Sequence, residues 1–158
     1  IDIEYIQQGL MDVVVKGRCE KVETGRDFTI MIDYAHTPDS LEKLLIAVRE
    51  TKTTGRIICL FGCGGDRDNS MRPMMGRIAG QNADFSIITS IKKTDGRYIC
   101  ITDRTQAISY AIHNAKKDDL IILAGKGHET YQEIKGVRSH FDDREVLIEL
   151  FENDNHKN

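Results

Sequence analysis

Three short segments hold most of the residue types that could do chemistry, and each follows an apolar run. They are residues 33–39 (Asp-Tyr-Ala-His-Thr-Pro-Asp), 62–68 (Gly-Cys-Gly-Gly-Asp-Arg-Asp) and 125–132 (Gly-Lys-Gly-His-Glu-Thr-Tyr-Gln). Ligands of open α/β sheets bind just beyond the carboxyl ends of the strands. We therefore predict that the three segments are loops that open on one edge of a sheet and share one site.

The segment 62–68 combines a flexible backbone with charge. Gly62, Gly64 and Gly65 let the chain turn sharply and let a ligand approach the main chain closely. Arg67, and Arg72 shortly after it, offer planar guanidinium groups suited to carboxylate or phosphate. The alternative is an ordinary connection, in which these arginines pair with neighbouring aspartates.

The other two segments also carry side chains that bind ligands. Asp33 at a strand end and His36 just before a helix are placed to hold ribose hydroxyls, phosphate or a base. The alternative for both is that they only satisfy backbone groups of the turn. In 125–132, two glycines expose main-chain amides, while Lys126, His128 and Glu129 offer charges of both signs.

Several common site types do not occur in the sequence. It has no P-loop spacing, no Gly-x-Gly-x-x-Gly turn after the first strand and no Gly-x-Ser-x-Gly elbow. The four cysteines form no Cys-x-x-Cys pair, so we expect no metal site and a reduced, cytoplasmic protein. A net charge of −3 gives no reason to expect nucleic acid as a partner. We expect no signal peptide and no membrane insertion, since no apolar run approaches the roughly 20 residues of a spanning helix.

The elements that must position these loops alternate between strand and helix. Expected strands cover 28–34, 57–61, 85–89, 98–102 and 120–124, and expected helices cover 38–51, 73–82, 104–115 and 143–151. A lead-in helix over 1–11 and short strands at 13–15 and 19–23 precede them, and a hairpin around 135–136 follows the last strand. The alternation predicts an α/β fold, with a Rossmann-like, mostly parallel sheet, helices on both faces and a C-terminal antiparallel hairpin.

Two features inside this pattern lead to separate expectations. Gly76 and Gly80, four residues apart in one helix, predict close packing of that helix against the sheet. Only eight residues separate Thr89 from Tyr98, whereas a parallel crossover needs a dozen or more. The residue types there favour an antiparallel hairpin on Asp95-Gly96. The alternative is that a segment is missing.

Four matches in order make the chain resemble the C-terminal domain of the Mur ligase superfamily over nearly its whole length. Asp-Tyr-Ala-His-Thr-Pro at 33–38 resembles the superfamily signature, which cyanophycin synthetases share. The segments 62–68 and 72–76 (Arg-Pro-Met-Met-Gly), together with 125–132, are similar to the muramyl-tripeptide ligases (MurE). Gly17-Arg18-x-Glu20 matches the start of the same domain.

The resemblance implies an ATP-dependent ligase of peptidoglycan synthesis. Such enzymes join a diamino acid to UDP-N-acetylmuramoyl-L-alanyl-D-glutamate through an acyl phosphate. Residues 1–16 would then lead in from a preceding domain, and 17–158 would form the C-terminal domain. Because the P-loop and the Mg²⁺ sites lie in a central domain of the family, this domain would hold no catalytic residue of its own and would be inactive alone. Its expected partners are the two substrates and the enzyme's N-terminal and central domains.

The resemblance also implies roles for single residues. Arg67 would bind the distal carboxylate of diaminopimelate and Glu129 its distal ammonium. Lysine has the ammonium but lacks that carboxylate, so the pair favours diaminopimelate. The full expected set comprises ATP contacts from Arg18, Asp33 and His36, amino-acid contacts from Arg67, Gly125 and Glu129, and supporting loop residues Gly64, Gly65, Arg72, Lys126 and His128.

One departure from the family concerns the connection after strand 85–89. The family carries an Asp-Asn-Pro-Arg or Asp-Asn-Pro-Ala motif there, followed by a helix, whereas here Thr89-Ser90 continues directly into Ile91. The resemblance therefore reverses the hairpin preference and implies a missing segment with its seam near Ser90–Ile91. That motif usually distinguishes diaminopimelate ligases from lysine ligases. A lysine-adding homologue therefore stays open, beside a non-catalytic nucleotide- or amino-acid-binding module.

Overall fold

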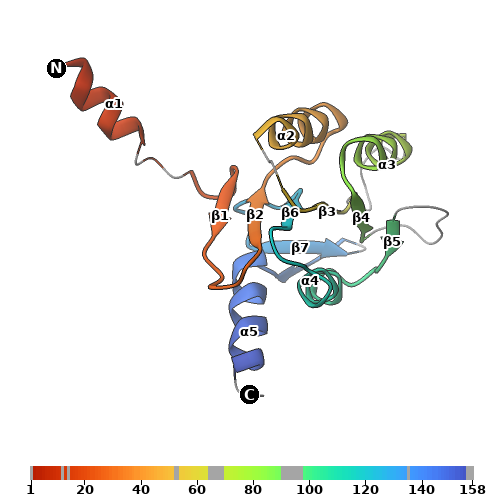
Figure 1. Ribbon diagram of the computed structural model, residues 1–158. Helices are drawn as coiled ribbons and strands as arrows, with labels where there is room; N and C mark the ends of the chain where they lie inside the picture. The colour runs from red at the N-terminus through yellow and green to blue at the C-terminus, as the bar shows by residue number, and fades with distance from the viewer. Residues whose placement is uncertain are drawn as a thin grey trace.

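The fold is a mostly parallel α/β sheet, as predicted (Figure 1). The computed structural model describes residues 2–11, 13, 15–51, 54–63, 70–89, 98–134 and 136–155. Within these ranges the strands are β1 (Glu20–Val22), β2 (Thr29–Asp33), β3 (Ile57–Phe61), β4 (Phe85–Ile88), β5 (Tyr98–Cys100), β6 (Leu120–Ala124), β7 (Tyr131–Ile134) and β8 (Val137–His140). The helices are α1 (Ile3–Met11), α2 (Pro38–Thr51), α3 (Met71–Asn82), α4 (Arg104–His113) and α5 (Asp143–Asn155).

The strand order is β1-β2-β6-β3-β4-β5, and β7 and β8 form a separate hairpin. Only β1 runs antiparallel within the larger sheet; its neighbour β2 and the strands beyond pair in parallel. The predicted C-terminal hairpin is confirmed, since β7 and β8 pair antiparallel.

Helices cover both faces of the larger sheet, as predicted. On one face α2 and α3 enclose an apolar core that includes Leu41 and Met75. On the other face α4 and α5 enclose a second core that includes Ile108 and Leu147 (Figure 1). Strands β3 and β6 are buried along their whole length, because side chains on both of their faces meet helices.

Helix starts follow the local sequence signals. Pro38 is the first residue of α2, and Thr37 and Ser40 exchange hydrogen bonds, with Ser40 N–H donating to Thr37 Oγ1 at 3.3 Å and Thr37 N–H donating to Ser40 Oγ at 3.1 Å. Asp103 caps α4, since its carboxylate accepts from Gln106 N–H at 2.8 Å. Helices α3 and α5 have the predicted type, but α3 begins at Met71 and α5 continues to Asn155.

Three expectations are wrong. No strand includes Val13 or Val15, the two described residues of the expected strand 13–15. Gly76 and Gly80 do not pack closely against the described sheet strands, because no atom of the described residues outside the helix's own nearby backbone lies within 4 Å of where a Cβ would stand at either position. The initial hairpin preference for 89–98 fails as well, since β4 and β5 pair in parallel with Ser86 opposite Tyr98. The expected seam at Ser90–Ile91 lies outside the described residues.

The lead-in helix α1 has the predicted position in the chain but extends away from the sheet (Figure 1). Its apolar side chains are exposed, with Ile3 and Leu10 at 69% and 68%. Of the helices in the described ranges, none has the length and apolar character needed to cross a membrane.

Candidate functional site

The loops after β2, β3 and β6 leave the sheet side by side, as the sequence predicts. In the parallel register Asp33 lies opposite Ala124, and Leu60 lies opposite Leu123, so the three strands end at the same level. Gly125 is where the loops meet. A Cβ on Gly125 would lie 3.8 Å from the carbonyl oxygens of both Ala35 and Gly62. Its φ of +99° is in the region that favours glycine.

The segment that contains Arg18 packs directly on the loop after β6. Gly17 has a φ of +70°, and a Cβ there would lie 2.3 Å from the carbonyl carbon of Gly127 and the amide nitrogen of His128. Gly127 in turn has no room for a Cβ, which would lie 2.7 Å from the Cβ of Tyr34. Backbone therefore contacts backbone at this point, and only glycine permits it at either position.

A charged pair holds these two glycines together. Glu20 accepts a hydrogen bond from Gly17 N–H at 2.5 Å and another from Arg144 Nε at 2.9 Å. Arg144 also donates from Nη1 to the carbonyl of Gly127 at 3.2 Å. The hydrogen bond from Arg144 lowers the pKa of Glu20 below its ordinary value. The start of α5 is thereby tied to both glycine turns.

Tyr34 connects the residues predicted for ATP with those predicted for the amino acid. Its hydroxyl donates to Glu129 Oε1 at 3.1 Å. The Arg18 guanidinium lies 4.6 Å from the centre of the Tyr34 ring, a cation–π distance. The His36 ring meets Tyr34 edge-on at 4.6 Å between centroids, and His128 lies at 5.3 Å. Tyr34 belongs to the 33–38 signature, but nothing in the sequence predicted this connecting role for it.

Asp33 and His36 support the turn that carries them. Asp33 is only 7% exposed, and its two carboxylate oxygens accept from Ala35 N–H at 2.7 Å and Cys19 N–H at 2.8 Å. The carbonyl of Tyr34 lies 2.8 Å from His36 Nδ1, so Nδ1 carries the proton and Nε2 is left as an acceptor. These contacts are the turn-supporting role given above as the alternative. Contact of either residue with ATP stays a prediction.

Glu129 already has a cationic neighbour. Lys126 Nζ lies 3.6 Å from Glu129 Oε2, and the two side chains are 15% and 20% exposed. Lys126 also donates to the carbonyl of Tyr131. Burial lowers the pKa of Lys126, and the Glu129 charge partly opposes that shift. A ligand ammonium at Glu129 would therefore share the carboxylate with Lys126.

A buried ion pair contacts the last residue of β6. Arg104 donates to both carboxylate oxygens of Asp143 at 2.8 and 2.7 Å, and from Nη2 to the carbonyl of Ala124 at 3.2 Å. Both side chains are buried, at 8% and 1% exposure. The partners lie far apart in the chain, so no local pattern marks them; the same is true of Glu20 and Arg144.

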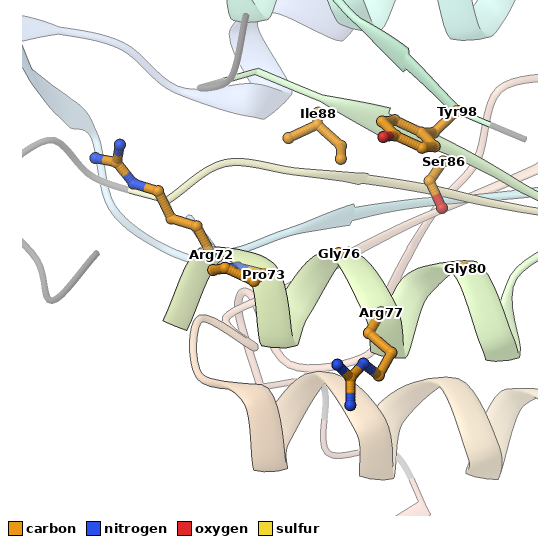
Figure 2. A pocket seen from close by; sticks show the side chains of 8 residues that line it. All are labelled: Arg72, Pro73, Gly76, Arg77, Gly80, Ser86, Ile88 and Tyr98. Carbon is orange, nitrogen blue, oxygen red and sulfur yellow. The ribbon is translucent and has the colours of Figure 1, made fainter. Parts of the chain in front are cut away.

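The remaining predicted residues lie after β3. Arg67, Gly64 and Gly65 are outside the described residues. Arg72 lies in the first turn of α3, and Figure 2 shows its side chain extending past the start of that helix, away from Arg77. The ranges that the structure describes contain no cluster of three His, Cys, Asp or Glu residues that could bind a metal ion.

The family model for the Mur ligase, glutamate ligase domain, matches residues 17–127. The UDP-N-acetylmuramoyl-L-alanyl-D-glutamate–2,6-diaminopimelate ligase of Caldanaerobacter subterraneus is 49% identical over 95% of this chain and 35% of that protein. The enzyme of the same name in Syntrophomonas wolfei is 46% identical over the same shares. A solved structure of such a ligase superposes with a TM-score of 0.80 at 31% identity, over 99% of this chain and 36% of that one. The chain thus spans about a third of the length of these relatives.

The two alignments also reveal a difference in length. Ninety-five per cent of 158 residues is about 150, yet the alignments extend over 168 and 170 positions. About 18 to 20 positions of the alignments are therefore gaps in this chain.

Proposed function

The chain belongs to the Mur ligase family, and from this we propose that it is the C-terminal domain of an ATP-dependent ligase that joins 2,6-diaminopimelate to UDP-N-acetylmuramoyl-L-alanyl-D-glutamate. The observation that carries the proposal is the 49% identity over 95% of the chain to a relative of that name. The loops that meet at Gly125 support it, because they bring Asp33, expected to contact ATP, and Gly125, expected to contact the diamino acid, to one sheet edge.

The reaction forms an amide. ATP supplies the phosphoryl group that converts the D-glutamate side-chain carboxylate into an acyl phosphate. The amino group of the diamino acid then attacks the acyl carbon, a C–N bond replaces the C–O bond to phosphate, and inorganic phosphate and a proton leave. The task of this domain is to orient the two substrates, an effect that lowers the barrier through proximity. By the family resemblance, we assign Mg²⁺ to the central domain of the enzyme.

Nucleotide contacts are assigned to Arg18 and His36, with Asp33 as their support. Arg18 is exposed, and stacking on Tyr34 directs its guanidinium, which suits a phosphate oxygen. His36 keeps Nε2 as an acceptor for a hydroxyl or amino hydrogen. Asp33 holds Cys19 and Ala35 through its carboxylate and so fixes the segments on which Arg18 and His36 lie.

The diamino acid is assigned to Glu129, Gly125 and Arg67. Glu129 would accept the distal ammonium, beside Tyr34 and Lys126. The amide of Gly125 already donates to the carbonyl of Asp33 at 3.0 Å, so its carbonyl is the group left for substrate. Arg67, which lies outside the described residues, is assigned to the distal carboxylate. On this assignment the substrate is diaminopimelate rather than lysine, and the ligase works in the cytoplasm, where ATP and the nucleotide-linked precursor are available.

The test is a chimera in which this chain replaces the matching third of the Caldanaerobacter ligase. Purified chimera, ATP, Mg²⁺ and the UDP-linked dipeptide are incubated with radiolabelled meso-diaminopimelate or lysine, and the UDP-linked product is counted after chromatography. We expect product with diaminopimelate and much less with lysine. A folded chimera that binds both amino acids but forms no product would favour the non-catalytic module, and a preference for lysine would overturn the substrate assignment.

A further inference from the structure

We propose that Lys126 is a specificity-determining residue, whose ammonium binds the distal carboxylate of diaminopimelate while Glu129 binds the distal ammonium. This assignment rests on the proposed function, because Glu129 must receive the distal end of the diamino acid. It extends that function by giving Lys126 a contact with the substrate and a part in the choice between diaminopimelate and lysine.

The ammonium of Lys126 has a defined place beside Glu129. Lys126 Nζ donates to the carbonyl of Tyr131, the first residue of β7, and lies 3.6 Å from Glu129 Oε2. The ring centres of Tyr131 and Phe141 lie 5.5 and 5.8 Å from Nζ, within the range of cation–π attraction. Lys126 and Glu129 therefore present a cation and an anion side by side.

Lys126 has hydrogen-bonding capacity that the described part of the chain does not use. A lysine ammonium carries three N–H donors. Among the described residues, Nζ has one hydrogen-bond acceptor, the carbonyl of Tyr131, because Glu129 at 3.6 Å lies beyond ordinary hydrogen-bond distance. Burial lowers the pKa of Lys126, although the charges of Glu129 and Asp143 oppose that shift. The cation is thus incompletely compensated, and a ligand carboxylate would supply a further acceptor.

The carboxylate of Asp143 does not fill this role. Its two oxygens accept from Arg104 at 2.8 and 2.7 Å, and Asp143 is only 1% exposed. Its charge is therefore already matched by that of Arg104. An additional anion for Lys126 has to come from the ligand.

A cation beside an anion matches the distal end of diaminopimelate. That end carries its ammonium and its carboxylate on the same carbon atom, so each charge can meet the opposite charge of Glu129 or Lys126. Lysine has the distal ammonium but not the carboxylate. It would bring its ammonium close to that of Lys126 and gain no compensating attraction. The same residue thus attracts one amino acid and disfavours the other, as specificity requires.

The experiment replaces Lys126 by Gln, which removes the charge and keeps an N–H donor for the carbonyl of Tyr131. The whole ligase, loaded with an ATP analogue and the UDP-linked dipeptide, is titrated calorimetrically with meso-diaminopimelate and with lysine. We expect the preference for diaminopimelate to fall about tenfold, since a charged hydrogen bond to its carboxylate is lost. Lysine should bind more tightly than to the wild type, because Glu129 no longer shares its charge with Lys126.

Two further variants serve as controls. Lys126→Arg keeps the positive charge and should retain the preference for diaminopimelate. Lys117→Gln makes the same change at an exposed lysine before β6, at the opposite end of that strand from Gly125, and should leave both affinities unchanged. If Lys126→Gln does not fold, Lys126→Met is measured in the same way, because it keeps an apolar chain beside the rings of Tyr131 and Phe141.

The outcomes separate this assignment from the proposed function. Equal weakening of both amino acids, with their ratio unchanged, would overturn the assignment and leave Lys126 the task of fastening the hairpin at Tyr131. A wild-type ligase that prefers diaminopimelate, together with a Lys126→Gln variant that keeps the full preference, would overturn the assignment alone. A wild-type ligase that binds neither amino acid would overturn the proposed function as well.

Discussion

Replacing Glu129 by Gln tests the proposed amino-acid site most directly. The change keeps the size of the side chain and an oxygen that can accept from Tyr34, now 3.1 Å from the carboxylate. It removes the charge. A hydrogen bond to a charged group contributes about 1.5–3 kcal/mol, so diaminopimelate should bind roughly 10- to 150-fold more weakly. Lys126, at 3.6 Å, already shares the Glu129 charge in the absence of ligand. We therefore expect a loss at the lower end, about tenfold.

The assay is calorimetric titration of the whole ligase, loaded with an ATP analogue and the UDP-linked dipeptide, with meso-diaminopimelate and with lysine. Both amino acids have a distal ammonium, so Glu129→Gln should weaken both by a similar factor and leave their ratio unchanged. Glu133→Gln is the matched control, since Glu133 lies on the neighbouring hairpin and pairs with Arg138 at 2.8 Å. Wild-type affinity in Glu129→Gln, or an equal loss in Glu133→Gln, would refute the assignment.

Further predictions concern the contacts that support the site. Gly17→Ala should lower the free energy of unfolding, measured in urea, by about 3 kcal/mol, because the new Cβ clashes with backbone and the φ is already strained. Gly25→Ala is the control and should lower it by about 1 kcal/mol, since Gly25 has a similar φ of +65° but no described atom within 4 Å of the new Cβ. Equal losses in the two variants would contradict this. Arg144→Met should lower the free energy of unfolding by about 2 kcal/mol at neutral pH, because it removes the hydrogen bonds to Glu20. Glu20 has a lowered pKa in the folded protein, so its stabilising effect is present above its ordinary value of 4.5 and is lost as the pH falls through the lowered pKa. The difference in unfolding free energy between the wild type and Arg144→Met should therefore become smaller in acid. A difference that stays constant with pH would argue against the pairing of Glu20 with Arg144. Arg104→Met should cost about 3–5 kcal/mol in the same assay, because it leaves a buried carboxylate unpaired; a loss below 1 kcal/mol would contradict the supporting role.

Local patterns predicted the elements well, because each depends on residues close together in the chain. The apolar run 57–61 became a strand buried along its length, and Thr37 with Pro38 marked the start of α2. The expectation that the three loops open on one edge of the sheet is confirmed at their first residues, since the parallel strands end at a common edge.

Predictions that depended on what packs against a residue fared less well. Gly76 and Gly80 were expected to contact the sheet, yet they border a groove. The Asp95-Gly96 turn pattern favoured a hairpin, but the pairing of β4 with β5 is parallel. Composition alone cannot report strand direction, because pairing is decided by the whole sheet.

The sequence by itself determined the strand and helix order, the loops that carry polar residues, and the resemblance that led to the ligase family. Only the tertiary structure decided that Tyr34 joins the two halves of the proposed site, that Glu20 and Arg144 hold two glycine turns together across 124 positions of the chain, and that a groove lies beside α3. The physical reason is the distance along the chain between the residues that interact. Helix starts and buried strands follow from neighbouring residues, whereas an ion pair or a groove exists only once distant segments have been brought into contact.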